Sequence, residues 1–241
     1  MNDQPVLIQT RANGVLTLTL NRPAARNALN LDLTRALKEA LLNYESDSGL
    51  RAALVTGVDP AFCAGLDLKE FSSPESPRGE VAAMIDMWPR LTKPMIAAIN
   101  GPAMTGGLEI ALACDFILAS ENARFADTHT KIGAMAGSGM GARLPDAVGQ
   151  RWAKQMSFTG IPIDAATALR IGLVNEVKPH GELLGYAQAL AANISALDSD
   201  LVTTQKRVID AGARAFLAQG LLLEKEALAE RKLRDGLRWT K

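Results

Sequence analysis

The chain has 241 residues, 48% of them apolar, which is enough to bury the core of one or two domains. Lys and Arg number 26 and Asp and Glu also number 26, so no overall field attracts nucleic acid or an anionic membrane. The two cysteines, Cys63 and Cys114, and the two histidines, His129 and His180, exclude Cys/His zinc frameworks and small disulfide scaffolds. We therefore expect no metal site.

Residues 1–6 are polar and lack the basic and apolar regions of a secretory signal. No apolar run reaches the roughly 18 residues that a membrane helix needs. With two cysteines expected to be free thiols, these features predict a soluble protein of the cytoplasm that has neither a nucleic-acid nor a membrane partner.

The first half of the chain alternates predicted strands and helices. Val15–Leu20 has the pattern of a strand, joined through the turn Asn13–Gly14 to an earlier strand near Ile8. Asn30 is a candidate N-cap for a helix that ends near Ser48. Short apolar runs predict strands at 52–56, 95–99 and 116–119. This alternation indicates an α/β fold.

Helices dominate the second half, and the sheet-forming part is expected to end near Val177. The helices are predicted over 165–171, 182–194, 200–213 and 215–237. Within the first half, residues 72–80 read SSPESPRGE and predict a mobile surface loop that could cover a site.

Two glycine-rich segments, Phe62–Asp67 and Asn100–Glu109, each follow a predicted strand and are expected to lead into a helix. Such turns present unpaired backbone N–H groups that can face a developing negative charge, so two of them can form an oxyanion hole. The alternative is that the glycines serve only tight turns and close helix packing.

Two titratable side chains lie close to these turns in the sequence. Glu109 sits one turn into a strongly apolar helix, where burial would raise the pKa of its carboxyl and suit it to proton transfer. The alternative is a first-turn glutamate that complements the helix dipole. His129 follows another short strand and could shuttle protons if it faces Glu109, or be structural. His180, between Pro179 and Gly181, is expected in a surface turn.

Other motifs point away from common chemistries. Residues 137–142 read GSGMGA and match a dinucleotide pattern, but no β-branched strand precedes them. The chain has no phosphate loop of the G-x-x-x-x-G-K-[ST] type, and Ser138 lacks the context of a nucleophile elbow. Cys63 has no histidine at a readable spacing, which disfavours a cysteine nucleophile.

Several separate motifs, in the right order and over most of the chain, resemble the enoyl-CoA hydratase/isomerase family, the crotonase superfamily. They are Leu20–Pro23 with Arg26–Leu29, Phe62–Leu68, Lys93–Pro94 running into Ala98–Gly101, Gly106–Glu109, Cys114–Asp115, the glycine run 137–141, Thr159–Gly160 and Gly172–Val174.

The resemblance implies a crotonase-like α/β spiral of ββα units over residues 1–195 and a C-terminal helical region over 196–241 that mediates trimers or dimers of trimers. It implies an acyl-coenzyme A thioester as substrate, with the thioester oxygen held by the N–H groups of Leu66 and Gly106. The segments that line the coenzyme A moiety correspond here to Arg26, Ala28, Ala64, Gly65, Leu66, Asp67, Leu68, Lys69 and Gly106.

The hydratases of this family use two glutamates; Glu109 matches the first and His129 stands at the position of the second. A Glu/His pair can share acid and base duties, so the implied reaction is hydration of a 2-trans-enoyl-CoA, with no cofactor besides the coenzyme A of the substrate. The alternatives are a catalytically reduced acyl-CoA binding protein, or another crotonase reaction by an isomerase, hydrolase, decarboxylase or dehalogenase.

The acyl pocket is expected to be lined partly by residues 72–90, including Met84, Met87 and Trp88. The alternative for this apolar stripe is core packing.

Overall fold

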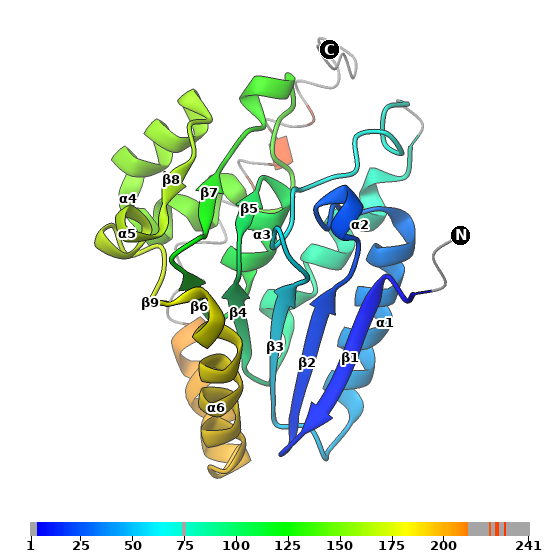
Figure 1. Cartoon of the computed structure of the whole chain (residues 1–241), viewed down its shortest axis with the longest axis vertical. Helices are drawn as coiled ribbons and strands as arrows, with labels where there is room; N and C mark the ends of the chain where they lie inside the picture. The colour runs from blue at the N-terminus through cyan, green and yellow to red at the C-terminus, as the bar shows by residue number, and fades with distance from the viewer. Residues whose placement is uncertain (1–3, 74–75, 212–221, 223–224, 227–228, 230–241) are drawn as a thin grey trace.

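A computed structural model of the chain describes residues 4–73, 76–211, 222, 225–226 and 229. Within them the strands form two sheets, one with the order β1-β2-β3-β4-β6-β9 and one with the order β5-β7-β8 (Figure 1). Helices connect the strands of the larger sheet and cover both of its faces. The α/β class predicted from the sequence is confirmed.

The larger sheet begins with a hairpin. β1 (Leu7–Ala12) pairs antiparallel with β2 (Val15–Leu20) across Asn13 and Gly14, which have φ values of 53° and 71°. Tight hairpin turns need this left-handed backbone, which asparagine and glycine tolerate best. The remaining strands join in parallel and are β3 (Ala52–Gly57), β4 (Met95–Ile99), β6 (Phe116–Ser120) and β9 (Glu176–Lys178).

The parallel direction decides where the loops meet. The segments that follow β3, β4 and β6 all leave the sheet at its carboxyl edge, which is the edge where open α/β sheets bind their ligands. Alternate strand residues face opposite sides: Leu54 and Ile96 pack with α6 (Leu183–Ser195), and Val55 belongs to the larger core cluster that includes α1 (Leu31–Ser46). The sheet is therefore covered on both faces.

Asn30 caps α1 as predicted, because its side-chain oxygen accepts a hydrogen bond of 3.0 Å from the amide of Leu33. The smaller sheet holds β5 (Pro102–Met104) parallel to β7 (Arg124–Ala126), which pairs antiparallel with β8 (Ile163–Asp164). The other helices are α2 (Arg78–Ile85), α3 (Gly106–Ala113), α4 (Met140–Thr159), α5 (Ala165–Arg170) and residues 199–211; the 3-10 turns are Pro23–Ala25, Trp88–Arg90, Thr130–Ile132 and His180–Glu182.

One sequence prediction is wrong in part. Residues 72–80 are not all loop, because α2 begins at Arg78, directly after Pro77, whose ring fixes φ near a helical value. The helix predicted over 215–237 lies almost entirely outside the described residues. In the part of the chain that the structure describes, no helix is both long enough and apolar enough to cross a lipid bilayer.

Candidate active site

Two backbone segments cross beside the start of α3. The carbonyl of Gly65 accepts from the amide of Leu29 at 2.7 Å, and the carbonyl of Cys63 accepts from the amide of Met104 at 2.9 Å. These bonds place Gly65 against the first turn of α3, so closely that a Cβ added to Gly65 would lie 3.3 Å from the amide nitrogen of Gly106. Gly65 has φ 93°, a conformation that favours glycine.

The amides of Leu66 and Gly106 lie at this crossing. Gly106 is the first residue of α3, so its N–H has no acceptor within the helix. Within the described chain, no backbone or side-chain oxygen accepts a hydrogen bond from the amide of either residue. The Leu66 turn was expected to open a helix and does not, because only a turn follows it. An isolated β-bridge to Leu29, and not the start of a helix, holds the backbone of Leu66 in place.

Glu109 lies one turn into α3 and is buried, with 4% of its surface exposed. One of its carboxylate oxygens accepts a hydrogen bond of 3.1 Å from the amide of Ser138. The carbonyl of Ser138 in turn accepts one of 2.6 Å from the buried guanidinium of Arg143. The guanidinium of Arg143 thus lies one peptide unit behind the amide that holds the carboxylate of Glu109.

His129 lies in the loop after β7, and its imidazole is bonded to Asp127. Nδ1 of the ring is 2.7 Å from Oδ1 of Asp127, and the side chains are 13% and 5% exposed. Burial alone would raise the pKa of the Asp127 carboxyl, but hydrogen bonds from His129 and Ser157 outweigh it and hold that pKa below its ordinary value. Asp127 is therefore an ionised partner of the ring at neutral pH.

Thr105 joins the His129 loop to the helix of Glu109. Its hydroxyl is hydrogen-bonded to that of Thr128, its amide donates to Ala126 at 2.9 Å, and its carbonyl accepts from the amide of Glu109 at 2.9 Å. Thr105 has φ 51°, which is strained for a β-branched residue and persists only where neighbouring contacts enforce it. The structure thus fastens the His129 loop to the start of α3, beside Gly106 and Glu109.

The sequence of the chain matches a known protein family over most of its length. A family model described as enoyl-CoA hydratase/isomerase matches residues 10–236. The chain belongs to the enoyl-CoA hydratase/isomerase family. The resemblance stated from the motifs is confirmed.

Individual relatives cover nearly the whole chain. A crystal structure of an enoyl-CoA hydratase from Mycobacterium avium superimposes with a TM-score of 0.87 at 46% identity, over 95% of this chain and 97% of that one. A "Probable enoyl-CoA hydratase" of Rhizobium meliloti is 37% identical over 93% of this chain and 88% of its own length. A short-chain-enoyl-CoA hydratase of Clostridium acetobutylicum is 36% identical over 93% and 88%. The crotonase-like fold implied by the motifs is confirmed.

The segments that the family resemblance assigns to coenzyme A lie together. The amide of Ala64 donates to the carbonyl of Arg26 at 3.0 Å, and the guanidinium of Arg22 bonds both the carbonyl of Ala28 and, at 2.9 Å, the carboxylate of Asp67. The side chains of the predicted residues differ: Arg26, Leu68 and Lys69 are exposed, whereas Ala28 and Gly65 are buried and the Asp67 carboxylate is paired. Of the exposed residues, only Arg26 and Lys69 can offer charge to a ligand.

The apolar residues that were expected to line the acyl pocket differ in burial. Met84 and Trp88 are almost fully buried, and the indole N–H of Trp88 donates to the sulfur of Met84 at 3.2 Å, so both belong to the core. Met87 is half-buried.

Burial raises the pKa of the Cys63 thiol to about 12, which leaves it protonated and unfit as a nucleophile at neutral pH.

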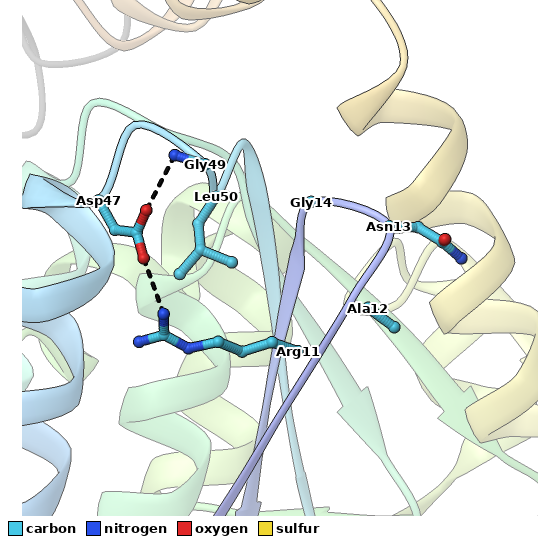
Figure 2. Close-up of a pocket in the computed structure, with 7 residues that line it drawn as sticks. All are labelled: Arg11, Ala12, Asn13, Gly14, Asp47, Gly49 and Leu50. Atoms are coloured by element: carbon cyan, nitrogen blue, oxygen red, sulfur yellow. Dashed lines mark hydrogen bonds and ion pairs between the residues drawn. The ribbon is translucent and has the colours of Figure 1, made fainter.

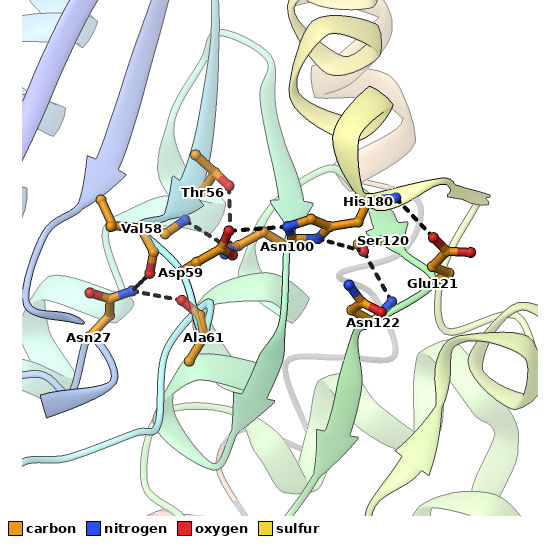
Figure 3. A network of polar contacts seen from close by, with 11 residues as sticks. Asn27, Thr56, Val58, Asp59, Ala61, Asn100, Ser120, Glu121, Asn122 and His180 are labelled. Atoms are coloured by element: carbon orange, nitrogen blue, oxygen red, sulfur yellow. Dashed lines mark hydrogen bonds and ion pairs between the residues drawn. The ribbon is translucent and has the colours of Figure 1, made fainter. Parts of the chain in front are cut away.

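His180 lies in a second polar cluster at the carboxyl edge of the larger sheet (Figure 3). Its ring nitrogens are 3.0 Å from Oγ of Ser120 and 3.1 Å from Oδ2 of Asp59, and Asn100 donates to the other oxygen of Asp59 at 2.9 Å. Ser, His and Asp are the residues of a nucleophilic triad. Here Ser120 is fully buried and accepts from the amide of Asn122, so the cluster fastens loops and presents no nucleophile.

A hollow of about 290 Å³ lies at the opposite edge of the larger sheet (Figure 2). Across it Arg11 and Asp47 form an ion pair of 2.8 Å. Its lining residues lie at the β1–β2 turn and just before β3, so the hollow is separate from the glycine segments that follow β3 and β5; they are Arg11, Ala12, Asn13, Gly14, Asp47, Gly49 and Leu50.

Several residues that shape the site were missed by sequence reasoning. Thr105, Ser138 and Arg143 act through contacts between segments that no spacing rule connects. Asp127 did carry a signal, because a carboxylate two residues before a candidate catalytic histidine can reach its ring.

Proposed function

We propose that the protein catalyses the addition of water to a 2-trans-enoyl-CoA, giving a 3-hydroxyacyl-CoA. The observation that carries the proposal is the pair of amides, Leu66 and Gly106, that lie beside a buried carboxylate, Glu109. Membership of the enoyl-CoA hydratase/isomerase family supports it.

The chemistry follows from where charge develops. When the oxygen of water bonds to the β-carbon, the electrons of the double bond move towards the thioester and its oxygen becomes enolate-like. Two backbone N–H groups stabilise that oxygen, and each such donor contributes about a hundredfold or more in rate. Glu109 positions the water and exchanges its proton, and His129 is its acid/base partner. One proton of the water ends on the α-carbon, which completes the addition.

The remaining components follow from the same geometry. Polarisation by amides requires neither a metal nor a redox cofactor, so coenzyme A enters only as part of the substrate. The exposed side chains of Arg26 and Lys69 supply positive charge for its phosphates.

We also propose that the enzyme works in the cytoplasm. Residues 196–241 mediate a homotrimer or a dimer of trimers, and light scattering of the purified protein would measure the mass of that assembly.

The direct test is loss of the enoyl thioester absorbance with purified protein on several chain lengths. Glu109→Gln should lower kcat by about 10²- to 10⁴-fold, because the amide cannot exchange a proton, while coenzyme A binding persists. Glu39→Gln on the exposed face of α1 is the matched control. An unchanged protein that is inactive on every enoyl-CoA would overturn the proposal.

One observation favours a second candidate, namely the histidine at the position where the family hydratases have a glutamate. The same oxyanion site would serve isomerisation, thioester hydrolysis or decarboxylation, because each passes through an enolate or a tetrahedral oxyanion. Mass spectrometry of a panel of acyl-CoA substrates separates these reactions by product mass and chromatographic position, and acyl-CoA affinity without any turnover would indicate a binding protein.

A further inference from the structure

Asp127 holds His129 by two hydrogen bonds to one oxygen. Oδ1 lies 2.7 Å from Nδ1 of the ring and accepts a second bond, of 3.2 Å, from the backbone amide of the same histidine. Two contacts from one carboxylate oxygen fix both the ring and the backbone that bears it. Because the two side chains are only 13% and 5% exposed, water competes little for these bonds.

The carboxylate determines where the proton of the neutral ring resides. An ionised carboxylate only accepts hydrogen bonds, so the ring nitrogen that faces it must carry hydrogen. The pKa of the Asp127 carboxyl lies below its ordinary value, for the reasons given above, so this residue is ionised throughout the neutral range. In neutral His129 the hydrogen therefore lies on Nδ1, and Nε2 carries the lone pair.

We propose that Asp127 is a positioning residue, which fixes the Nδ1–H tautomer of His129 and makes Nε2 the nitrogen that exchanges the substrate proton. The second half of the proposal rests on the hydration proposed above, whereas the tautomer does not. When Nε2 takes up a proton, the adjacent carboxylate stabilises the imidazolium, so the pair supplies both a base and, after protonation, an acid.

The loop around the pair supports this role. The carbonyl of His129 accepts from the amide of Ala134 at 2.9 Å, Thr128 is bonded to Thr105, and Ser157 bonds the Asp127 carboxylate. The loop that bears the ring is thus attached to the segment that precedes α3, and the carboxylate is attached to α4. A ring held in this way keeps one orientation relative to Gly106, as proton transfer requires.

His180 is the second imidazole in the same spectrum, and its ring nitrogens lie against Ser120 and Asp59. With only two histidines in the sequence, nitrogen-15 correlation spectra of the imidazoles contain two patterns, and His180→Gln assigns them. Above its titration midpoint, His129 should show a protonated Nδ1 and an unprotonated Nε2. A protonated Nε2 would overturn the proposal.

Removing the charge tests the role of Asp127 itself. Asp127→Asn keeps an acceptor of the same shape but removes the negative charge, so the titration midpoint of His129 should fall by about one pH unit or more. In the same variant kcat for an enoyl-CoA should fall at least about tenfold, with KM changed by less than about twofold. An unchanged midpoint would overturn the proposal, and the tautomer of the unchanged protein decides it if the variant does not fold.

The two proposals fail separately. Absence of turnover on every enoyl-CoA would overturn the hydration, whereas the tautomer spectrum is recorded without substrate and still decides whether Asp127 sets the protonation of His129.

Discussion

The two histidines of the chain are each bonded to an aspartate, in very different surroundings. His129 and Asp127 are two residues apart in one loop, and their side chains are only 13% and 5% exposed. His180 and Asp59 are 121 residues apart, and the aspartate side chain is 60% exposed. The first pair orients one ring in the loop after β7, which Thr105 joins to the start of α3, whereas the second joins a loop after β3 to the turn after β9. The same residue types thus serve local positioning in one region and long-range attachment in the other.

The surroundings also determine how much each His–Asp pair contributes to the stability of the fold. An exposed ion pair contributes about 0–1 kcal/mol, because water and salt screen it. A buried carboxylate that loses its donors costs more, since its charge is left without solvation. Asp59 has a lowered pKa mainly through the hydrogen bond from Asn100, with His180 adding to it. Asp127 depends on hydrogen bonds from the His129 ring, from Ser157 and from the His129 amide to offset burial.

The largest expected difference between the regions is in catalysis. His129→Gln should lower kcat for an enoyl-CoA by about 10²- to 10⁴-fold, because glutamine cannot exchange a proton at neutral pH. His180→Gln is the matched change in the other region and should leave kcat within about twofold, since both of its ring nitrogens serve structural bonds. Steady-state kinetics on both variants measure the difference, and equal losses would remove the functional distinction between the two histidines.

A second expected effect concerns how closely the two glycine segments pack beside the start of α3. Their crossing depends on close backbone contact, because a Cβ added to Gly107 would lie 2.2 Å from the carbonyl oxygen of Cys63. Gly107→Ala should therefore lower the free energy of unfolding by about 1–3 kcal/mol or more, as overpacking does. Chemical denaturation measures this effect.

Gly106→Ala is the control for that prediction. Its added Cβ would meet Gly65 and a Leu29 methyl at 3.5 Å, an ordinary contact, so unfolding should change by less than about 1 kcal/mol. A Gly107→Ala protein as stable as the control would show that the crossing of the two segments is not tightly packed.

The sequence predicted the elements whose signals are local. The Asn13–Gly14 hairpin, the Asn30 cap and the apolar strands β3, β4 and β6 were all found from nearby residues. α4 was missed, because Pro145 and Gly149 lie inside it and Gly149 has a non-helical φ of 74°. β5 and β8 have three and two residues, too few for an apolar pattern.

In the candidate site too, the residues with local signals were predicted and those placed by tertiary contacts were not. Glu109 was placed correctly in a buried helix turn, because the apolar residues around it are its neighbours in sequence. The contacts of Glu109 with Ser138 and of Thr105 with Thr128 span 29 and 23 residues and depend on the packing of α3 against α4 and on the pairing of β5 with β7. Backbone strain at Thr105 is likewise set by tertiary contacts, so no local rule reveals it.

A further expected effect is in acid, where both aspartates should lose their contribution to stability. Each carboxyl has a folded pKa below its ordinary value, so its ionised form stabilises the fold above the unfolded pKa near about 4, and the contribution disappears as the pH falls through the folded pKa. Asp59→Asn should cost less than about 1 kcal/mol at about pH 6, since Asp59 is exposed.

Asp127→Asn should cost more at the same pH, about 1–3 kcal/mol, because the lost charge leaves buried donors with a weaker acceptor. For both variants the difference from the unchanged protein should shrink between about pH 6 and about pH 3, because protonation removes the same charge from the native aspartate. Urea unfolding over this range measures both curves. If Asp59→Asn costs as much as Asp127→Asn, burial does not separate the two pairs and the contrast between the two histidine regions is limited to their geometry.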